Sequence, residues 1–586
     1  MRYPEMTEIP TYRDMIDAFG GYNHNLRIGD GEFYDMKNLS STSYPIMAPR
    51  CKRGVYESPT AARALIAKDS LCYVDGEYFV MNQYRVNMGL RDFYDDDGKL
   101  IPKQLVPMGS YVIILPDKKY INTANVDDYG GIDAEYVSAS DVTFSLCTLE
   151  GAEYENIVRG NTAPDDTTKL WLDESTTPHC LKQYASASAM WITIPTTYIK
   201  ISAPGIGADF KQYDGVVISG IVASGCEALN SAMVIQKQDS DYIVVIGILD
   251  ETVTQTASQG AITVSRAMPR MDFVIESENR LWGCRYGPNN KGEVVNEIYC
   301  SKLGDFKNWN CFMGISTDSY AASVGSDGQF TGAITHLGHP LFFKENCLHK
   351  VYGNYPANFQ IQTTACRGVQ KDSPKSLAIV NETLFYKGRL GVCAYDGSLP
   401  TEMSTALGEV AYFNAVAGSH GNKYYISMAD GDGDYHLFVY DTAKGMWHKE
   451  DNTQADAFCS CRNEMYYIDH ADGKIKTVFG SGTAEADPVS WVAESGIIGV
   501  DSPDKKYISK LNVRMAMDIG SNVEFFIEYD SMGDWDYVCT IHGHNLRSFT
   551  IPIRPRRCDH LRLKIVGVGN AKVFSICKTI EQGSDV

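Results

Sequence analysis

The sequence predicts an all-β protein built mainly as a β-propeller. Two observations support this fold class: a strand-and-turn composition and a degenerate internal repeat. The 586 residues include 36 tyrosines and 51 glycines, alongside strings of valine, isoleucine and threonine. Aromatic and β-branched residues favour strands, and glycine favours the tight turns that join them. A chain of this length is expected to form several domains, on the order of 150 residues each.

The repeat contains a polar or glycine turn, an aromatic and aliphatic strand, a second turn and a second strand. About seven copies are found, and most are spaced by roughly 30 to 45 residues, the period of propeller blades. A closed ring of such sheets buries the face of each blade against its neighbours and leaves only short edges. The copies lie at residues 76–89, 109–123, 279–306, 339–356, 382–397, 422–448 and 463–480.

Three further segments do not follow the repeat. A strand-rich stretch of about 145 residues separates the second and third copies, and it is too long for a loop. Alternating strands after the last copy predict a β-sandwich. The first 60 residues are rich in glycine, asparagine and proline and predict an extended arm that needs partners to become ordered. The expected domains are the arm 1–60, propeller blades 61–125 and 269–482, the inserted β-domain 126–268 and the sandwich 483–586.

Charge and composition exclude several classes of protein. The net charge of −20 argues against binding nucleic acid through its phosphates, which requires clustered lysine and arginine. The first residues lack the basic and apolar regions of a signal peptide, and no apolar run is long enough for a membrane helix. The 16 cysteines contain no C-x-x-C pair, so we expect buried thiols rather than disulfides or zinc. We therefore expect a protein made in a cytoplasm, with no membrane partner.

Common catalytic and cofactor motifs are absent. The chain has no H-E-x-x-H, G-x-S-x-G, Walker A or G-x-G-x-x-G pattern, so we predict no enzyme, no catalytic residue and no cofactor. Asp430, Asp432 and Asp434 alternate as in the first half of a calcium loop. The sixth position is Tyr435 instead of glycine, and the twelfth is Asp441 instead of glutamate. This stretch predicts a polar hairpin tip rather than a metal site.

The segment "YDTAKGMWH", residues 440–448, predicts a structural lock between blades. Asp441 can accept hydrogen bonds from turn amides, and Trp447 can fill the wedge between two sheets. A sugar-binding role for this tryptophan is the alternative, and the structural role is favoured.

A second aromatic motif follows "ENRLWGCRYG", which contains Trp282, in the stretch "IYCSKLGDFKNWNCF". Gly304 and Asp305 are expected to form a turn. Phe306 and Trp309 are then expected to pack back between blades. These positions predict architecture rather than chemistry.

Two groups of residues resemble the tail nozzle or tail hub ("stabilisation") proteins of short-tailed bacteriophages. In the arm, the resemblance is a Gly-Glu-x-x-Asp-x-x-Asn segment that runs into Pro-Arg. In the blade, it is Arg-Leu-Trp followed by a Ser-x-x-Gly-Asp-Phe-x-x-Trp loop. The matching residues are Gly31, Glu32, Asp35, Asn38, Pro49 and Arg50 in the arm, and Arg280, Leu281, Trp282, Ser301, Gly304, Asp305, Phe306 and Trp309 in the blade.

This resemblance implies a structural protein of the virion tail. Members of the family form a ring, typically a hexamer, below the portal-adaptor and beside other tail proteins. Their central channel retains packaged DNA and opens for its ejection, so the genome passes without sequence-specific binding. By this resemblance the chain is expected in a phage tail, as a homo-oligomer with no enzymatic activity.

The alternative function is carbohydrate recognition, by a receptor-binding protein or a glycan-hydrolysing propeller, because propellers and sandwiches host such sites. It predicts an aromatic platform with two or three carboxylates at a propeller mouth.

A cluster of arginines near the end of the chain has two interpretations. Arg554, Arg556 and Arg557 stand together in an otherwise acidic chain. They form either a solvated strand end or a cationic patch that contacts an acidic neighbouring subunit.

Overall fold

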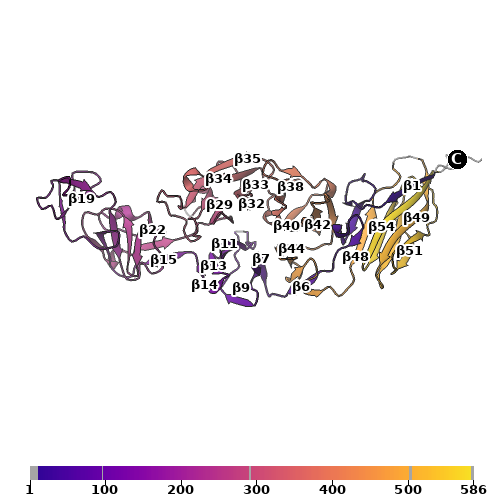
Figure 1. Cartoon of the computed structure of the whole chain (residues 1–586), viewed down its shortest axis with the longest axis horizontal. Helices are drawn as coiled ribbons and strands as arrows, with labels where there is room; N and C mark the ends of the chain where they lie inside the picture. Colours follow the sequence, from indigo (N-terminus) through magenta and orange to yellow (C-terminus); the bar gives the residue numbers. More distant parts are fainter. Residues whose placement is uncertain (1–10, 96, 290–291, 501–503, 583–586) are drawn as a thin grey trace, which may run out of the picture.

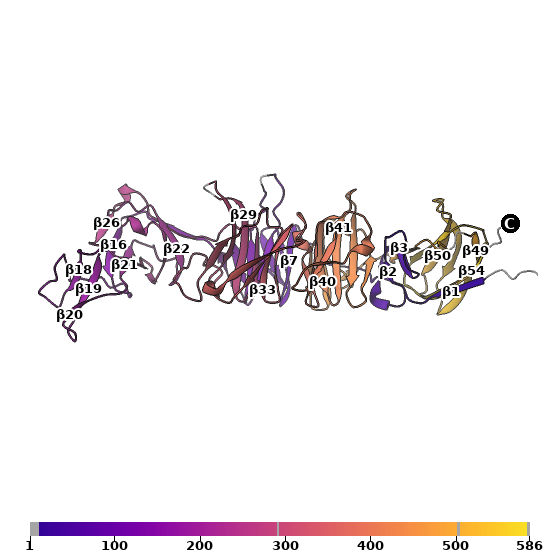
Figure 2. The same cartoon turned by 90° about the horizontal axis from the view of Figure 1, so that it is seen from above.

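The computed structural model describes residues 11–95, 97–289, 292–500 and 504–582. The molecule is elongated, with a β-propeller in the middle, an inserted β-domain at one end and a β-sandwich at the other (Figures 1 and 2). In the described residues, strands form nearly all regular structure, and each helix is a three-residue 3-10 turn. The predicted all-β fold class is confirmed. None of the helices in these ranges has the length and apolar character needed to cross a membrane.

Seven small antiparallel sheets form the ring of the propeller within the described residues (Figure 1). Each copy of the sequence repeat lies in one of these sheets, so the expectation of about seven blades is confirmed. Blade one runs from β7 (Ala62–Lys68) to β10 (Tyr84–Asn87), blade two from β11 (Gln104–Met108) to β14 (Asn125–Gly131), and blade three from β28 (Phe273–Ser277) to β31 (Tyr320–Ser323). Blade four runs from β32 (Gly332–His336) to β35 (Gln360–Ala365), blade five from β36 (Ala378–Val380) to β39 (Thr401–Glu402), and blade six from β40 (Phe413–His420) to β43 (Met446–Lys449).

The arm supplies the strand that completes the seventh blade. β44 (Ala455–Cys461), β45 (Glu464–Asp469) and β46 (Ile475–Thr477) follow one another in the chain, and β6 (Gly54–Glu57) pairs antiparallel with β46. β47 (Thr483–Ala484) pairs with β6 on its other side. Gly54 is needed here because a Cβ atom would lie 2.1 Å from the carbonyl oxygen of Ser481. The two ends of the propeller sequence are therefore held together by backbone hydrogen bonds.

Other strands of the arm join the propeller to the sandwich. β2 (Gly21–Tyr22) pairs with β43 of blade six, and β3 (Glu32–Lys37) pairs with β48 (Ser490–Ser495) of the sandwich. As a result, one ten-stranded sheet runs from blade six through the arm into the sandwich. β1 (Thr11–Ile16) pairs with β54 (Ala571–Gln582). The partners that the described part of the arm needs lie in its own chain.

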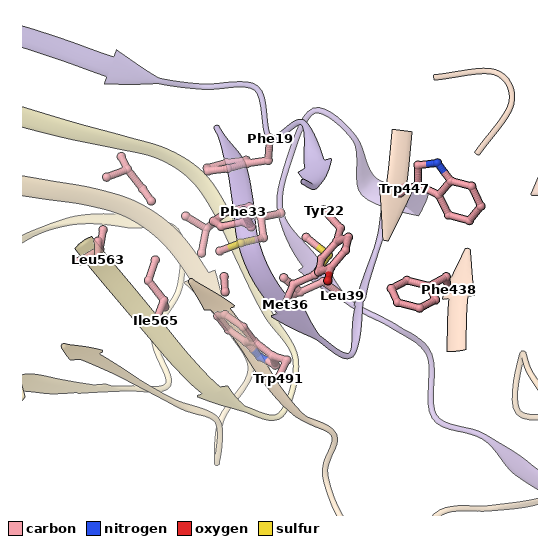
Figure 3. Close-up of a cluster of buried hydrophobic side chains, with 14 of the residues drawn as sticks. Phe19, Tyr22, Phe33, Met36, Leu39, Phe438, Trp447, Trp491, Leu563 and Ile565 are labelled. Atoms are coloured by element: carbon pink, nitrogen blue, oxygen red, sulfur yellow. The ribbon is translucent and has the colours of Figure 1, made fainter. Parts of the chain in front are cut away.

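A single hydrophobic core accompanies this sheet (Figure 3). Phe438 and Trp447 contribute from blade six, and Tyr22 and Phe33 contribute from the arm. Trp491 belongs to the sandwich and is completely buried in the same cluster. These residues belong to one contiguous cluster of buried side chains, so the propeller and the sandwich share one core across the arm.

The sandwich itself consists of two sheets. One has the order β1-β54-β49-β52, and the other is the distal part of the ten-stranded sheet, β3-β48-β53-β50-β51. Buried and exposed residues alternate along β49, as a sheet with one face on a core requires. The remaining strands are β49 (Lys506–Met517), β50 (Asn522–Tyr529), β51 (Asp536–His542), β52 (Arg547–Ile551) and β53 (Leu561–Val568).

The inserted domain connects blade two to blade three. It runs from β15 (Ala134–Val137) to β27 (Thr263–Arg266), which pair antiparallel at its root. The expected boundary at residue 126 falls within β14, the outer strand of blade two. The insert has its own hydrophobic core. The insert has three sheets, with the strand orders β15-β27-β22-β23, β24-β25-β21-β16-β26 and, at its distal end, β17-β18-β19-β20. The bounds of its other strands are β16 (Val142–Cys147), β17 (Ile157–Gly160), β18 (Leu170–Asp173), β19 (Cys180–Ala185), β20 (Met190–Thr193), β21 (Tyr198–Ser202), β22 (Gly215–Ser219), β23 (Ala232–Val234), β24 (Lys237–Asp239), β25 (Tyr242–Ile246) and β26 (Val253–Gln255).

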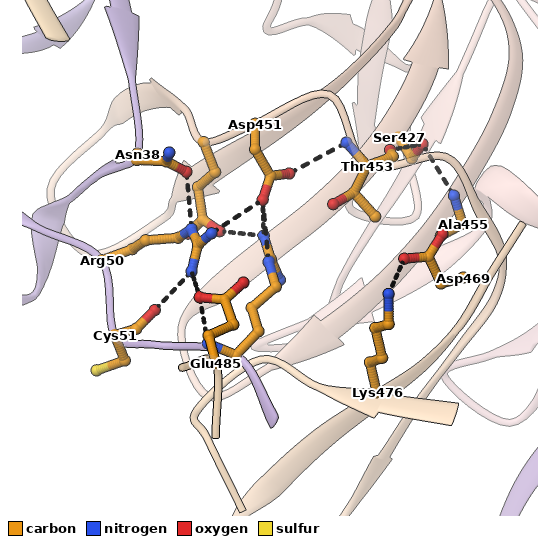
Figure 4. A network of polar contacts seen from close by, with 12 residues as sticks. Asn38, Arg50, Cys51, Ser427, Asp451, Thr453, Ala455, Asp469, Lys476 and Glu485 are labelled. Carbon is orange, nitrogen blue, oxygen red and sulfur yellow. Dashed lines mark hydrogen bonds and ion pairs between the residues drawn. The ribbon is translucent and has the colours of Figure 1, made fainter. Parts of the chain in front are cut away.

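A buried ionic network fixes the arm to blades six and seven (Figure 4). Arg53 donates to Glu450 at 2.8 Å and to Asp451 at 3.0 Å, and Arg50 lies 3.3 Å from Glu485. Burial acts to raise the pKa of Asp451, but the nearby arginines outweigh it and lower that pKa to about 2. Because the arginines compensate buried carboxylates, removing one of them would leave a buried negative charge without its partner.

Candidate functional site

The tryptophan motifs identified in the sequence lie at contacts between blades. Trp282 of β29 (Arg280–Pro288) is buried between blades three and four, with its ring centroid 4.9 Å from that of Phe359. Trp447 packs 5.0 Å from Tyr440 and donates its indole N–H to the carbonyl oxygen of Met403 in the preceding blade segment. These side chains are therefore part of the packing and do not line an open site.

Asp441 contacts both its own turn and the arm. Its carboxylate accepts a hydrogen bond from the N–H of Ala443 at 3.1 Å, which is the turn contact expected from the sequence. It also accepts the hydroxyl of Ser41 at 2.6 Å. The latter contact joins the blade to the arm, and the local sequence around Asp441 gives no sign of it.

The loop that contains Asp305, Phe306 and Trp309 packs against blade two. Trp309 is 3% exposed and donates its indole N–H to the carbonyl oxygen of Phe306 at 2.9 Å. The Phe306 ring lies 5.2 Å from both Tyr111 and Tyr120. Asp305 accepts the N–H of Lys307 within the turn. The loop thus fills the wedge between blades two and three.

The same loop holds the root of the insert. Asn308 donates to Asp214 at 2.9 Å and accepts the N–H of Gly215, also at 2.9 Å. Asp214 forms an ion pair with Arg266 of β27. A Cβ atom on Gly215 would lie 2.4 Å from the carbonyl carbon of Asn310, so the backbones must approach this closely. The aromatic loop therefore positions the insert as well as the blade.

The arginines near the end of the chain lie in the connection between β52 and β53. Arg554, Arg556 and Arg557 are all exposed. Arg556 lies 3.5 Å from Asp536 and over the ring of Tyr529. These contacts are within the chain, and the proposed role of the cluster at a subunit contact stays a prediction.

The Asp430 loop is a hairpin tip. Asp430 accepts the N–H groups of Asp432 and Asp434 at 3.0 Å each, and its second oxygen lies 2.9 Å from His436. Among the described residues, no group of three histidine, cysteine or acidic side chains is arranged to hold a metal ion.

An open cavity of about 430 Å³ lies at one end of the ring of blades. It lies where the inner strands β28, β32, β40 and β44 begin, and the loop between blades one and two covers one side. We call it the channel mouth. Its lining includes Asp95, Lys99, Gln104, Asp272, Phe273, Phe330, Thr331, Lys371, Asp372, Lys375, Asn414, Tyr435, Gln454 and Asp456.

Polar groups of the channel mouth are only partly occupied by protein partners. The Thr331 side chain is buried, at 6% exposure, yet its hydroxyl has no hydrogen-bond partner in the described residues. The ammonium group of Lys375 donates to the main-chain oxygen of Asp456 at 2.8 Å. Burial lowers the pKa of Lys375. Leaving a buried donor unpaired is unfavourable, so these groups are suited to receive a polar ligand.

Aromatic rings accompany these polar groups. Phe273 and Phe330 stand at the inner ends of blades three and four, and Tyr435 belongs to β42 (Tyr435–Asp441) of blade six. Burial raises the pKa of Tyr435, and the side chains of Asn414 and Gln454 form hydrogen bonds with its hydroxyl. The channel mouth therefore combines apolar rings with donors and acceptors.

A second cavity of about 340 Å³ adjoins the first and shares Asp95, Gln104 and Asp272 with it. It extends to the segment Met268–Met271 between β27 and β28, at the root of the insert. Together the two cavities form a groove that leads from the channel mouth toward the inserted domain.

Sequence reasoning assigned none of the channel-mouth residues to a binding site, and of them it named Tyr435 only as a position in the Asp430 loop. They come from the loop between blades one and two and from the starts of blades two to seven, with no common local pattern. A signal that could have found them is their position just before or at the start of each inner strand of the repeat. The rival hypothesis did predict carboxylates and aromatic rings at a propeller mouth.

Comparisons with known proteins describe the architecture only. No family model matches the chain, and no curated protein matches it. Similar solved structures include an exo-β-1,3-galactanase from Phanerochaete chrysosporium with galactose, at 9% identity and a TM-score of 0.21, covering 51% of this chain and 94% of that one. A GH43 glycoside hydrolase gives 8% identity and a TM-score of 0.20, covering 53% and 96%. Trypanosoma rangeli sialidase gives 9% identity and a TM-score of 0.20, covering 83% and 93%.

The expectation of a structural tail protein without enzymatic activity finds no support in these neighbours, and we do not retain it. They are glycoside hydrolases and a sialidase, and nothing in them concerns a phage tail. The short motifs behind that expectation form blade and arm contacts, which a propeller needs whatever its function. At TM-scores near 0.2 the likeness transfers no activity to this chain, so a function has to be argued from the channel mouth itself.

Proposed function

We propose that this protein recognises a carbohydrate in the channel mouth. The observation that supports the proposal is the cavity of about 430 Å³, which combines aromatic rings with amide, carboxylate, hydroxyl and ammonium groups. Its volume lies within the range of about 300 to 1,000 Å³ for small-molecule sites. The adjoining cavity provides space for further sugar units along the groove.

The chemistry of the lining suits a sugar better than an apolar ligand. Beyond their hydrogen bonds to the Tyr435 hydroxyl, Asn414 and Gln454 each keep a donor and an acceptor on one planar group, which matches neighbouring hydroxyls on a pyranose ring. Tyr435 and Phe273, which are only partly buried, offer apolar rings against which the C–H face of a sugar can pack. The unpartnered Thr331 hydroxyl supplies one more hydrogen-bonding group within the same cavity.

A glycan array probed with the full-length protein tests this proposal. We expect selective binding to a limited set of glycans, and we expect Asp456→Asn and Thr331→Val to weaken it about 10-fold or more, since each changes a hydrogen-bonding group that lines the cavity. Asp534→Asn, at an exposed position of the sandwich, is the matched control and should bind as the wild type does. Absence of binding to any glycan, or unchanged binding by both mouth variants, would refute carbohydrate recognition there.

A reducing-sugar assay on the same glycans separates recognition from hydrolysis. Release of reducing ends that is lost in Asp456→Asn and kept in Asp534→Asn would show that the channel mouth also catalyses cleavage. Stable binding without release would define a recognition module.

A further inference from the structure

The charged groups of the channel mouth differ in how their charges are compensated. Most of its carboxylates already have partners in the protein. Asp272 forms an ion pair with Arg285 at 2.5 Å, and Asp456 accepts from His470 at 2.9 Å. Asp372 lies 3.6 Å from Lys99.

The fourth carboxylate is used within its own loop. Asp95 accepts the main-chain N–H groups of Asp97 and Lys99, at 3.1 and 2.8 Å. None of the four acidic side chains of the mouth is therefore free of a hydrogen-bonding or ionic partner in the described residues.

Two lysines of the mouth lack a comparable partner. Lys375 contacts the main-chain oxygen of Asp456, while the Asp456 carboxylate is directed to His470. For Lys371, the protein contact is made by its main-chain N–H, which donates to Glu345. In the described residues no carboxylate forms an ion pair with either ammonium group, although the Asp456 charge acts on Lys375 from nearby.

Both lysines are carried by one short, well-fixed segment, Lys371 to Lys375, which enters β36. Two hydrogen bonds hold Ser373 in the middle of this segment. Its hydroxyl accepts the N–H of Ala415 at 3.0 Å, and its carbonyl oxygen accepts the hydroxyl of Ser376 at 2.7 Å. The amines are therefore held at the cavity by a preorganised backbone rather than by a flexible loop.

We infer that the carbohydrate bound in the channel mouth carries an anionic group, a carboxylate or a sulfate, that pairs with Lys375 and Lys371. This inference rests on the proposed carbohydrate function. An anion would compensate a partly buried ammonium group that the protein leaves without an ion pair. It would also use the donor capacity of Lys375 beyond its single bond to a carbonyl oxygen.

Binding of matched acidic and neutral glycans tests the inference. The probes are sialylated, uronate-containing and sulfated oligosaccharides, each beside its desialylated, carboxyl-reduced or desulfated counterpart. We expect the acidic member of at least one pair to bind about 10-fold or more tightly than the neutral member, as a charge-assisted hydrogen bond gives. The series that responds distinguishes a carboxylate from a sulfate.

Lysine variants link that preference to the site. Lys375→Met should abolish the preference for the acidic member, and Lys375→Arg should retain it because the positive charge remains. Lys572→Met, at an exposed position of β54, is the control and should keep the wild-type preference. Far-ultraviolet circular dichroism of each variant shows that it is folded.

The failure of this inference differs from the failure of the proposed function. Equal binding of acidic and neutral members, weakened by Asp456→Asn, would overturn the anionic ligand and leave carbohydrate recognition intact. A preference for acidic glycans that survives Lys375→Met and the double variant Lys371→Met/Lys375→Met would place the anion elsewhere and also overturn the inference. No binding to any glycan would overturn both.

Discussion

The two ends of the molecule are attached to the propeller in different ways. The sandwich shares a continuous sheet and one hydrophobic core with blade six through the arm (Figure 3). The insert has a separate core, and a polar cluster around Asp214, Asn308 and Arg266 joins its root to the propeller. Residues buried in one core unfold together, whereas a polar contact between two cores allows them to unfold separately.

The different attachments of the sandwich and the insert indicate which part of the groove is rigid. The channel mouth is built from inner strands of the ring, which is closed by β6 of the arm. The second cavity instead includes Met268–Met271, the connection between the insert and blade three. A change in the position of the insert would therefore alter the outer part of the groove and leave the mouth unchanged.

Removal of the arm is expected to have the largest effect. Deleting residues 1–57 removes β6 from blade seven, β2 and β3 from the shared sheet, and β1 from the sandwich. We expect loss of cooperative unfolding for both propeller and sandwich, measured by urea denaturation followed by tryptophan fluorescence. A truncated protein that still unfolds cooperatively at the wild-type midpoint would contradict the shared core.

Truncation of Trp309 should strongly weaken the contact between blades two and three. Because this side chain is 3% exposed, Trp309→Ala should cost about 3–5 kcal/mol in the free energy of unfolding. The neighbouring Phe312 is 54% exposed, so Phe312→Ala should change stability by no more than about 0.5 kcal/mol. Wild-type stability of Trp309→Ala would show that the ring is accessible and would revive a binding role for this loop.

Replacing Arg53 tests the ionic network that fixes the arm (Figure 4). Arg53→Met leaves Glu450 and Asp451 buried without their closest cation and should destabilise the protein by about 3–5 kcal/mol. As a matched control, Arg63→Met breaks a half-exposed pair with Asp92 and should cost no more than about 1 kcal/mol. Equal effects of the two substitutions in urea denaturation would disprove a special role for the buried network.

The pH dependence of stability provides a more selective test of the same network. The pKa of Asp451 falls from 3.8 to about 2 on folding, so its stabilising contribution is present above about pH 4 and is lost as pH falls toward 2. One pKa unit corresponds to about 1.4 kcal/mol. The stability difference between wild type and Asp451→Asn should therefore shrink by about 2 kcal/mol between pH 5 and pH 2. A difference independent of pH would contradict the lowered pKa.

The polar root of the insert should give the smallest effect on global stability. Asn308→Ala removes the hydrogen bonds to Asp214, to Gly215 and to Asp305 in its own loop, at a cost of about 1–3 kcal/mol that we expect to fall on the root of the insert and on this loop. Hydrogen exchange should increase near residues 213–216 and remain unchanged in β48 and β53. Increased exchange throughout the sandwich would show that the two attachments are coupled.

The sequence predicts local features of this protein better than its long-range pairings. The repeat identified the blades because each has the same alternation of turn and strand. The turn contact of Asp441 also follows from the residues around it. By contrast, "GVYE" at residues 54–57 gives no sign that it completes blade seven, because its partner β46 lies more than four hundred residues away.

The candidate site was harder to predict than the fold for the same reason. The strong local motifs, such as Trp282 and Trp309, serve packing between blades. Lys375, Tyr435 and Thr331 meet only after the ring closes, and none has a distinctive neighbour in sequence. The net charge of the whole chain is negative, so it gave no indication of the two lysines in the channel mouth that lack a carboxylate partner.

Hydrogen exchange of the full-length protein with and without its best-binding acidic glycan tests the proposed function most directly. We expect protection at the segments that line the channel mouth, 99–102, 329–331, 371–375, 414–416 and 454–456. The distal sheet of the insert and the sandwich should exchange at the same rate in both states. Protection confined to the insert or to the sandwich, with the channel mouth unchanged, would contradict the assignment of carbohydrate recognition to the propeller.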